Sequence, residues 1–364
     1  MRRDATAIAK RQRSVKGHRG PLLTAIGVAC FTLAVGALGS QSPRPAINVW
    51  YGEEQRFGRL GNSQPRINIL GSIERHDGVE SLSYSLNGAS ATALSMGVDL
   101  RRLARPGDFN IEIERSDLLN GANDVVIRAI LQGGGTLSSS VRAHYTPGRV
   151  WTLPYTIDWS KAEQIQDVAE IIDGLWKLTP QGVRTAEPYY DRVIAIGDMQ
   201  WKDYEVFTSV IFHRMLAPEI LPKGPPFSNH AHASLLLRWG GHDDDGKQPR
   251  VKWHPTGGLA MLRADADSEG NRWIWHGGES GILAEETHFR PIEVGNRYYF
   301  RARVETLPGP KTRYSVKGWG TQDQEPPDWD LVSVDGGQDL QSGSLLLVVH
   351  HSDVTFGNVD VKPL

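Results

Sequence analysis

Cysteine is almost absent from this chain, since one residue, Cys30, occurs among 364. It lies inside an apolar run, residues 21–40, so the chain after that run contains no cysteine. No disulfide can form there, and packing alone must stabilise the fold. Tryptophan is abundant by contrast, with eleven residues. That many indole rings predict either large aromatic cores or exposed stacking surfaces.

Net charge is also small, at −2, but it hides one uneven stretch. Residues 1–20 hold a single acid, Asp4, and seven bases: Arg2, Arg3, Lys10, Arg11, Arg13, Lys16 and Arg19. Because an apolar run follows directly, the bases indicate membrane topology and not nucleic-acid binding. We predict a basic cytoplasmic tail at residues 1–20 and a signal-anchor or signal peptide at residues 21–40.

The apolar run allows two outcomes. Its length favours an uncleaved transmembrane helix, whereas the small residues Ala37 and Gly39 before Ser40 favour cleavage. With an uncleaved helix, the protein is a single-pass cell-membrane protein, held in the membrane through residues 21–40, with extracytoplasmic C-terminal domains. With cleavage, it is secreted.

Several catalytic motifs are missing. The sequence has no Gly-x-Ser-x-Gly nucleophile elbow and no phosphate-binding loop. Histidine spacing gives only a weak metal signal, because His230 and His232 share a strand face while His350 and His351 point to opposite faces. No three histidines converge by spacing, so we predict no metal ligands and treat these residues as structural.

Short strand patterns fill residues 46–147. Candidate strands cover residues 47–51, 66–73, 81–86, 108–114, 123–129 and 137–145. Six or seven strands in about 100 residues are typical of an immunoglobulin-like β-sandwich. The run NILGSIERHDGVESLSYSLNG, residues 68–88, resembles immunoglobulin-like and cadherin-like modules. No acidic cluster of calcium-site spacing accompanies it, so we expect a spacer domain.

Longer alternating strands follow a predicted linker at residues 146–154. The strand that begins at Tyr204 places Tyr204 and Val206 on one face and Glu205 and Phe207 on the other. Further candidate strands cover residues 230–239, 259–263, 272–276, 297–305, 313–319, 344–350 and 354–361. Residues 158–173 fit either a helix or an edge strand. Apart from the apolar run, the pattern predicts an all-β fold of two-layer sandwiches.

Five runs in this region carry a resemblance to a known superfamily. They are GLWKL (174–178), IGDMQWKDYEV (196–206), SLLLRW (234–239), YYFRARVE (298–305) and VTFGNVDV (354–361). Together they resemble the concanavalin A-like lectin/glucanase superfamily, the jelly-roll group that includes laminin G-like domains. The resemblance covers residues 155–364 and implies a C-terminal jelly-roll sandwich of a group that contains both glycan binders and glycan hydrolases.

Hydrolases of that superfamily carry a Glu-x-Asp-x-Glu or Glu-x-Asp-x-x-Glu signature on one strand, where residues that share a face bring two catalytic carboxylates together. No copy of that signature occurs here. The nearest run is Asp265-Ala266-Asp267-Ser268-Glu269, which we expect to be a hairpin turn, with a calcium-binding loop or a catalytic strand as alternatives. The run Asp243-Asp244-Asp245 has the same alternatives. We predict no catalytic residue and no cofactor, with calcium as the one ion to consider.

Polar and aromatic residues alternate with the apolar ones on three of the strands. If Leu235, Leu237 and Trp239 face the core, one opposite face should collect the candidate ligand-binding residues: His232, Arg238, Tyr299, Arg301, Lys317 and Trp319. Forked donors beside aromatic rings suit a sugar, although a solvated sheet face is the alternative.

The predicted function is lectin-like carbohydrate binding, with a glycan or glycan-bearing partner and no catalysis. One alternative is a glycoside hydrolase, for which the candidate carboxylates are Glu285, Glu286, Asp328 and Asp330. Another alternative is a structural adhesion or assembly protein.

Overall fold

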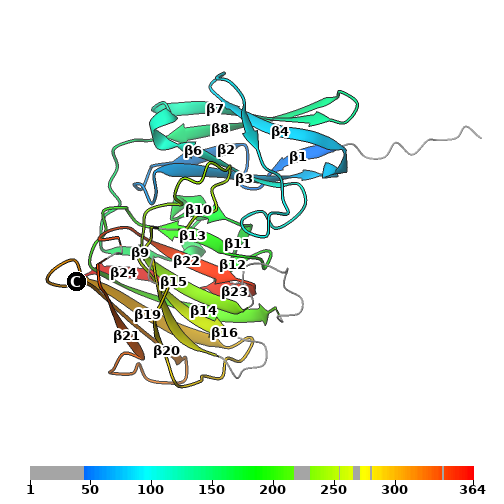
Figure 1. Cartoon of the computed structure of the whole chain (residues 1–364). Helices are drawn as coiled ribbons and strands as arrows, with labels where there is room; N and C mark the ends of the chain where they lie inside the picture. Colours follow the sequence, from blue (N-terminus) through cyan, green and yellow to red (C-terminus); the bar gives the residue numbers. More distant parts are fainter. Residues whose placement is uncertain (1–44, 217–229, 254, 265–270, 279–280, 338–339) are drawn as a thin grey trace, which may run out of the picture. The chain divides into compact units, whose positions relative to one another are not determined.

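β-Sheets make up the structure, joined by turns and short 3₁₀ segments. A computed structural model describes residues 45–216, 230–253, 255–264, 271–278, 281–337 and 340–364 (Figure 1). The all-β prediction is confirmed for these residues. None of the helical segments in this described part is long and apolar enough to cross a membrane. The expected tail and apolar run, residues 1–40, lie outside the described residues.

Two sheets form a first sandwich from residues 46–145. One has three strands in the order β1 (Ala46–Val49), β3 (Arg66–Glu74) and β6 (Asp108–Glu114). The other has five, in the order β2 (Glu54–Phe57), β8 (Thr136–Tyr145), β7 (Gly121–Leu131), β4 (Val79–Leu86) and β5 (Thr92–Leu94). Ile69 and Phe109 from the first sheet and Ile127 and Val141 from the second share one core. The immunoglobulin-like family of this sandwich stays a prediction.

A second, larger sandwich follows. Its seven-stranded sheet runs β10 (Glu170–Asp173), β13 (Arg192–Ile196), β22 (Ser344–His350), β15 (Ala231–Trp239), β16 (Gly258–Ala264), β17 (Arg272–Gly277) and β18 (Gly281–Glu285). The path of its nine-stranded sheet runs β11 (Trp176–Thr179), β12 (Gly182–Thr185), β23 (Ser352–Phe356), β14 (Tyr204–Met215), β19 (Arg297–Thr306), β20 (Thr312–Gly320) and β21 (Leu331–Asp335). The last two strands of this sheet, β24 (Val359–Pro363) and β9 (Tyr155–Ile157), pair with each other, and β24 also pairs with β14.

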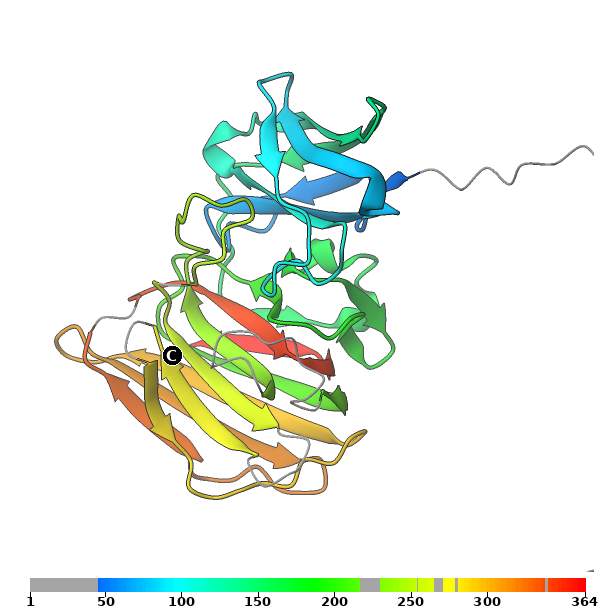
Figure 2. The ribbon, with the colours of Figure 1, turned by 45° about the vertical axis from the view of Figure 1, so that its right-hand side comes forward.

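Strands from distant parts of the chain alternate in these sheets. Figure 2 shows red C-terminal strands beside green ones from the middle of the chain, and β22 lies hydrogen-bonded between β13 and β15. The core between the two sheets is rich in aromatic rings, including Tyr204, Trp273, Trp275, Phe300 and Tyr314. Much of the tryptophan content therefore has a packing role, as the aromatic-core interpretation predicted.

One predicted strand, residues 354–361, is split in two. β23 ends at Phe356 and β24 begins at Val359, although both pair with β14. Gly357 lies between these two strands. Its carbonyl accepts a hydrogen bond from Trp159 Nε1 at 2.8 Å, and the backbone N–H of Gly357 donates to the carbonyl of Ser209 at 2.7 Å. These bonds locally replace the regular ladder. Residues 158–173 form two 3₁₀ turns followed by the edge strand β10, so the helix alternative is wrong.

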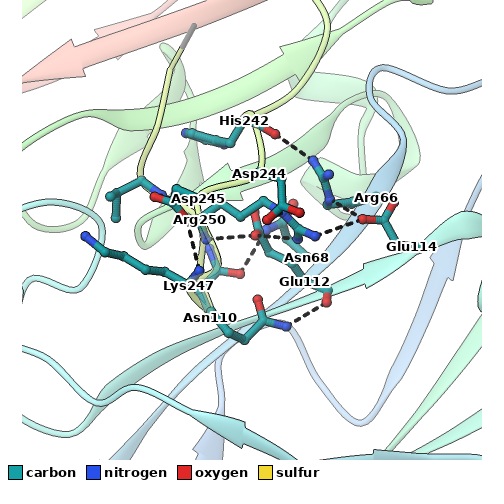
Figure 3. Close-up of polar contacts among 12 residues, drawn as sticks. Arg66, Asn68, Asn110, Glu112, Glu114, His242, Asp244, Asp245, Lys247 and Arg250 are labelled. Atoms are coloured by element: carbon teal, nitrogen blue, oxygen red, sulfur yellow. Dashed lines mark hydrogen bonds and ion pairs between the residues drawn. The ribbon is translucent and has the colours of Figure 1, made fainter.

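Charged side chains of the first sandwich contact the second across a buried polar network. Arg102 Nη1 lies 2.7 Å from Glu112, and Arg102 Nε lies 2.7 Å from Asp173. Figure 3 shows the adjoining part, in which Arg66 donates to the carbonyl of His242 and Arg250 contacts Glu112. Burial alone would raise the pKa of Glu112, but Arg102, His242 and the Arg250 backbone N–H lower it to about 2.

The predicted linker, residues 146–154, is tied to the second sandwich. Trp151 belongs to the main core, and its carbonyl accepts a hydrogen bond from the indole of Trp201. By their contacts, residues 44–364 form one compact unit. Division into independently folding domains at residues 46–147 and 155–364 stays a prediction.

Candidate functional site

Three neighbouring strands of the nine-stranded sheet turn polar and aromatic side chains away from the core. On β14 the apolar residues Tyr204, Val206 and Val210 point into the core, so Glu205, Phe207 and Ser209 point outward. The register then aligns three rows: Glu205 with Arg303 and Ser315, Phe207 with Arg301 and Lys317, and Ser209 with Tyr299 and Trp319. We call this surface the β14–β19–β20 face.

Three aromatic rings form a cluster on the β14–β19–β20 face. Phe207 stacks on Tyr299 with ring centroids 5.5 Å apart, and on Trp319 with centroids 5.9 Å apart. Tyr299 and Trp319 face each other across the ladder at 5.6 Å. We call these three residues the aromatic patch. Rings held against one another in this way are fixed in orientation, which suits a platform for an apolar sugar face.

Cations and carboxylates flank the aromatic patch. The guanidinium of Arg301 lies 4.9 Å from the Phe207 ring centroid, while the Arg303 guanidinium lies 5.1 Å and the Lys317 ammonium 5.2 Å from the ring of Trp329. Glu205 pairs with Arg301 and with Arg303.

Glu325 is the second carboxylate beside the aromatic patch. Its carboxylate lies 2.8 Å from Arg301 Nε and 2.9 Å from Lys317 Nζ. Partial burial would raise the pKa of Glu325, but Lys317 and Arg301 lower it, so the carboxylate stays charged. Three cations on this face thus meet two carboxylates, and the surface offers fixed donors and acceptors together.

A hollow of about 620 Å³ adjoins the aromatic patch at Trp319. Arg290, Asn296, Arg297, Gln322 and Asp323 are among its polar lining residues. Its size falls in the range of about 300–1,000 Å³ common for small-ligand sites. Trp319 is therefore shared by the β14–β19–β20 face and the hollow, although only 9% of its surface is exposed.

Four of the six predicted ligand-binding residues meet on this surface: Tyr299, Arg301, Lys317 and Trp319. The other two, His232 and Arg238, lie on β15 in the seven-stranded sheet, so the prediction of one shared face is wrong for them. The register of β15 shifts between Leu236 and Trp239, as at a β-bulge. A bulge reverses the alternation beyond it, and Trp239 packs with Leu236 in a cluster outside the main core.

Arg238 lies within this bulge and is fully buried. Its guanidinium donates to the carbonyl of Lys202 at 2.9 Å and to Thr312 Oγ1 at 3.1 Å, and it pairs with Asp203 at 2.9 Å. All of these partners lie in or beside the nine-stranded sheet. Arg238 therefore joins the two sheets at the end of the sandwich.

The candidate carboxylates of a hydrolase do not make a free pair. Glu285 pairs with Arg272, and Asp328 is exposed. Glu286 and Asp330 both bind Arg290, at 2.7 and 2.8 Å, and each accepts a backbone N–H as well. A carboxylate that cycles between acid and base must exchange its proton with substrate, whereas these two are held by a permanent cation.

The acidic run Asp243-Asp244-Asp245 is held by an ion pair and by hydrogen bonds within a turn. Asp243 pairs with Lys252, and Asp244 and Asp245 accept the backbone N–H groups of Gly246 and Lys247, as the turn interpretation predicted. The run at residues 265–269 lies outside the described residues.

Three groups of types that can bind a metal come together in the folded sheet, although no three histidines converge by spacing along the chain. The absence of metal ligands stays a prediction. One ligand atom each from Asp191, His232 and His350 lies within 4.8 Å of the others. Spacing along the chain could not reveal this cluster, because β15 and β22 pair only in the folded sheet.

Sequence reasoning also missed Glu205, Phe207, Glu325 and Trp329 as members of the candidate site. Alternation along β14 does assign Glu205 and Phe207 to the outward side. The sequence does not show which strand pairs with β14, because the pairing of β14 with β19 joins residues almost 100 positions apart. Glu325 and Trp329 lie in the loop before β21 and carry no strand signal.

Comparisons with known proteins give only distant likenesses. No family model and no curated protein matches the chain. The exoplasmic/lumenal domain of VIP36, in a Ca²⁺- and Man3GlcNAc-bound form, is 14% identical over 58% of this chain and 90% of its own, with a TM-score of 0.38. A Bacillus subtilis protein with a galectin-like fold is 10% identical over 57% and 94%, with a TM-score of 0.36.

A lyase is among the similar structures too. The alginate lyase Aly36B is 12% identical over 57% of this chain and 88% of its own, with a TM-score of 0.31. Since these TM-scores are below 0.5, the likenesses transfer neither a fold family nor an activity to this chain.

Proposed function

We propose that the β14–β19–β20 face and the adjoining hollow bind a glycan, or the glycan of a larger partner, without cleaving it. The observation that carries this proposal is the aromatic patch of Phe207, Tyr299 and Trp319, with Trp319 lining the hollow. Sugar rings have an apolar C–H side and a rim of hydroxyls. The patch offers rings for the first and Arg301, Lys317 and Glu325 for the second.

Binding without turnover follows from how the nearby carboxylates are held. Glu205 and Glu325 are each paired with two cations, and Arg290 holds both Glu286 and Asp330. Hydrolysis of a glycosidic bond needs one carboxylic acid and one carboxylate on either side of the bond. Lys317 and Arg301 lower the pKa of the Glu325 carboxyl, which disfavours the acid role for that group.

The proposal includes the concanavalin A-like, lectin-like family for the second sandwich and a location outside the cytoplasm. Both rest on sequence: the first on the five runs described above, the second on the basic tail before residues 21–40.

A glycan array probed with the full-length protein, with and without calcium, tests the proposal. We expect selective binding to a restricted set of glycans. Binding that is the same with calcium and with a chelator would show that the acidic runs are not required. Absence of binding across neutral, acidic and sulfated glycans would contradict the proposal, as would release of reducing sugar or unsaturated product from a bound polysaccharide.

A further inference from the structure

Three histidines gather at one end of the seven-stranded sheet, away from the β14–β19–β20 face. His232 on β15 lies directly opposite His350 on β22 in the ladder, and their ring centroids are 4.7 Å apart. His230 precedes His232 by two residues, with its ring centroid 5.5 Å from that of His232 and 5.7 Å from that of His350. The three imidazoles therefore form a compact triangle.

Hydrogen bonds occupy Nδ1 of each of the two strand histidines. His350 Nδ1 lies 2.7 Å from Asp191, and His232 Nδ1 lies 2.6 Å from Ser234 Oγ. A carboxylate acceptor fixes the proton of His350 on Nδ1 and the lone pair on Nε2. Among the described residues, His350 Nε2 and His230 Nε2 are buried without a hydrogen-bond partner.

Buried polar atoms without partners are rare, and each calls for a reason. Here two of them belong to side chains of one cluster, and His232 and His350 are each only 4% exposed. Aromatic packing alone would be served as well by residues without ring nitrogens. A ligand that accepts several lone pairs at once accounts for both unpartnered nitrogens.

We propose that His230, His232 and His350 bind a divalent transition metal of the zinc class, with Asp191 as the residue that positions His350. Three imidazole nitrogens at about 2.1 Å from a metal, near tetrahedral angles, put their ring centroids about 5 Å apart. The observed centroid separations, 4.7, 5.5 and 5.7 Å, are close to this spacing. One ligand atom each from Asp191, His232 and His350 lies within 4.8 Å of the others, which supports the placement of the site at this end of the β15–β22 ladder.

Binding of one metal by both His232 and His350 requires their rings to rotate. The His232 and His350 planes are parallel within 3°, whereas nitrogens that share one metal need planes that converge. Rotation about χ2 of histidine meets only a broad, shallow preference, so this adjustment is within reach. The carboxylate–histidine pair of Asp191 and His350 matches the outer partner that metal-bound histidines ordinarily have.

Charged side chains of both signs lie near the cluster. Arg263, opposite His232 on β16, adds positive charge nearby, and Asp191 offsets it.

Cobalt titration of the full-length protein, purified without a histidine tag and stripped with a chelator, tests the proposal. We expect the visible bands of tetrahedral Co²⁺ to saturate at one equivalent and to disappear when Zn²⁺ is added. Wild-type protein that binds no Co²⁺ or Zn²⁺ at millimolar concentration, or that gives only octahedral bands, would overturn the proposal without any variant.

Variants assign the ligands. His232→Ala and His350→Ala should each lower the affinity for Co²⁺ at least tenfold, and Asp191→Asn by about 10- to 100-fold. His144→Ala, at an exposed residue beside Glu54 in the first sandwich, should change nothing. His230→Gln provides a milder change at a half-buried position if the alanine variants do not fold. Equal binding by wild type, His230→Gln and Asp191→Asn would overturn the assignment.

Discussion

Arg238 donates its backbone N–H to the phenolic oxygen of Tyr204 at 2.9 Å, and the bond joins the two sheets of the second sandwich. Both residues are fully buried. Arg238 has a φ of 61°, in the left-handed region that few residues other than glycine adopt. The bond thus supports a strained backbone position at the β15 bulge.

Tyr204→Phe should lower the free energy of unfolding by about 1–3 kcal/mol, because it leaves the buried N–H of Arg238 without an acceptor. Urea denaturation followed by tryptophan fluorescence measures this effect. Tyr298→Phe is the matched control, since its hydroxyl accepts an N–H from the exposed residue Glu293 and should matter less. Equal stability of Tyr204→Phe and wild type would show that the bond does not support the bulge.

Arg102→Ala should lower the free energy of unfolding by about 3–5 kcal/mol, since it leaves two buried carboxylates, Glu112 and Asp173, without their common cation. Arg142→Ala is the control. Arg142 pairs with Asp124 and both side chains are more than half exposed, so its loss should cost at most about 1 kcal/mol. Chemical denaturation of both variants gives the comparison, and equal losses would contradict a buried network.

Glu112 should make stability fall in acid. The pKa of its carboxyl is about 2 in the folded protein, below its ordinary value of 4.5. The stabilisation from this group is present above pH 4.5 and is lost as pH falls from 4.5 towards 2. In Glu112→Gln the free energy of unfolding should depend less steeply on pH across that window. Identical slopes for wild type and Glu112→Gln would contradict the depressed pKa.

Much of the fold could be predicted from sequence because the strands alternate clearly. On β19, Phe300, Ala302 and Val304 are buried and the residues between them are partly exposed, as the pattern predicted. Alternation failed on β15, where every residue is buried and a bulge shifts the register. A strand covered on both faces has no polar side to fix its phase.

The candidate site was harder to predict, since it depends on which strands pair. Alternation of side chains along two consecutive strands was enough to predict that four residues share a face: Tyr299, Arg301, Lys317 and Trp319. Phe207 comes from a strand almost 100 residues away, and His350 reaches His232 across an even longer separation. Only the sheet order brings these residues together.

Topology can be tested apart from the fold. The seven bases of residues 1–20 lead us to expect that the chain after Ser40 is protected from protease added to inverted membrane vesicles. Immunoblotting for the second sandwich, before and after detergent is added, measures the protection. Digestion of that sandwich without detergent would rule out this orientation.

Calorimetric titration of Trp319→Ala with a glycan selected on the array tests whether the aromatic patch binds a glycan. Loss of one stacked ring should remove about 1–3 kcal/mol of binding free energy, so affinity should fall about tenfold or more. Phe289→Ala is the control, since Phe289 is 60% exposed and lies outside both the patch and the lining of the hollow. We expect Trp319→Ala to remain folded and to lose affinity, while Phe289→Ala binds as wild type does. Unchanged affinity in a folded Trp319→Ala protein would contradict glycan binding by the aromatic patch.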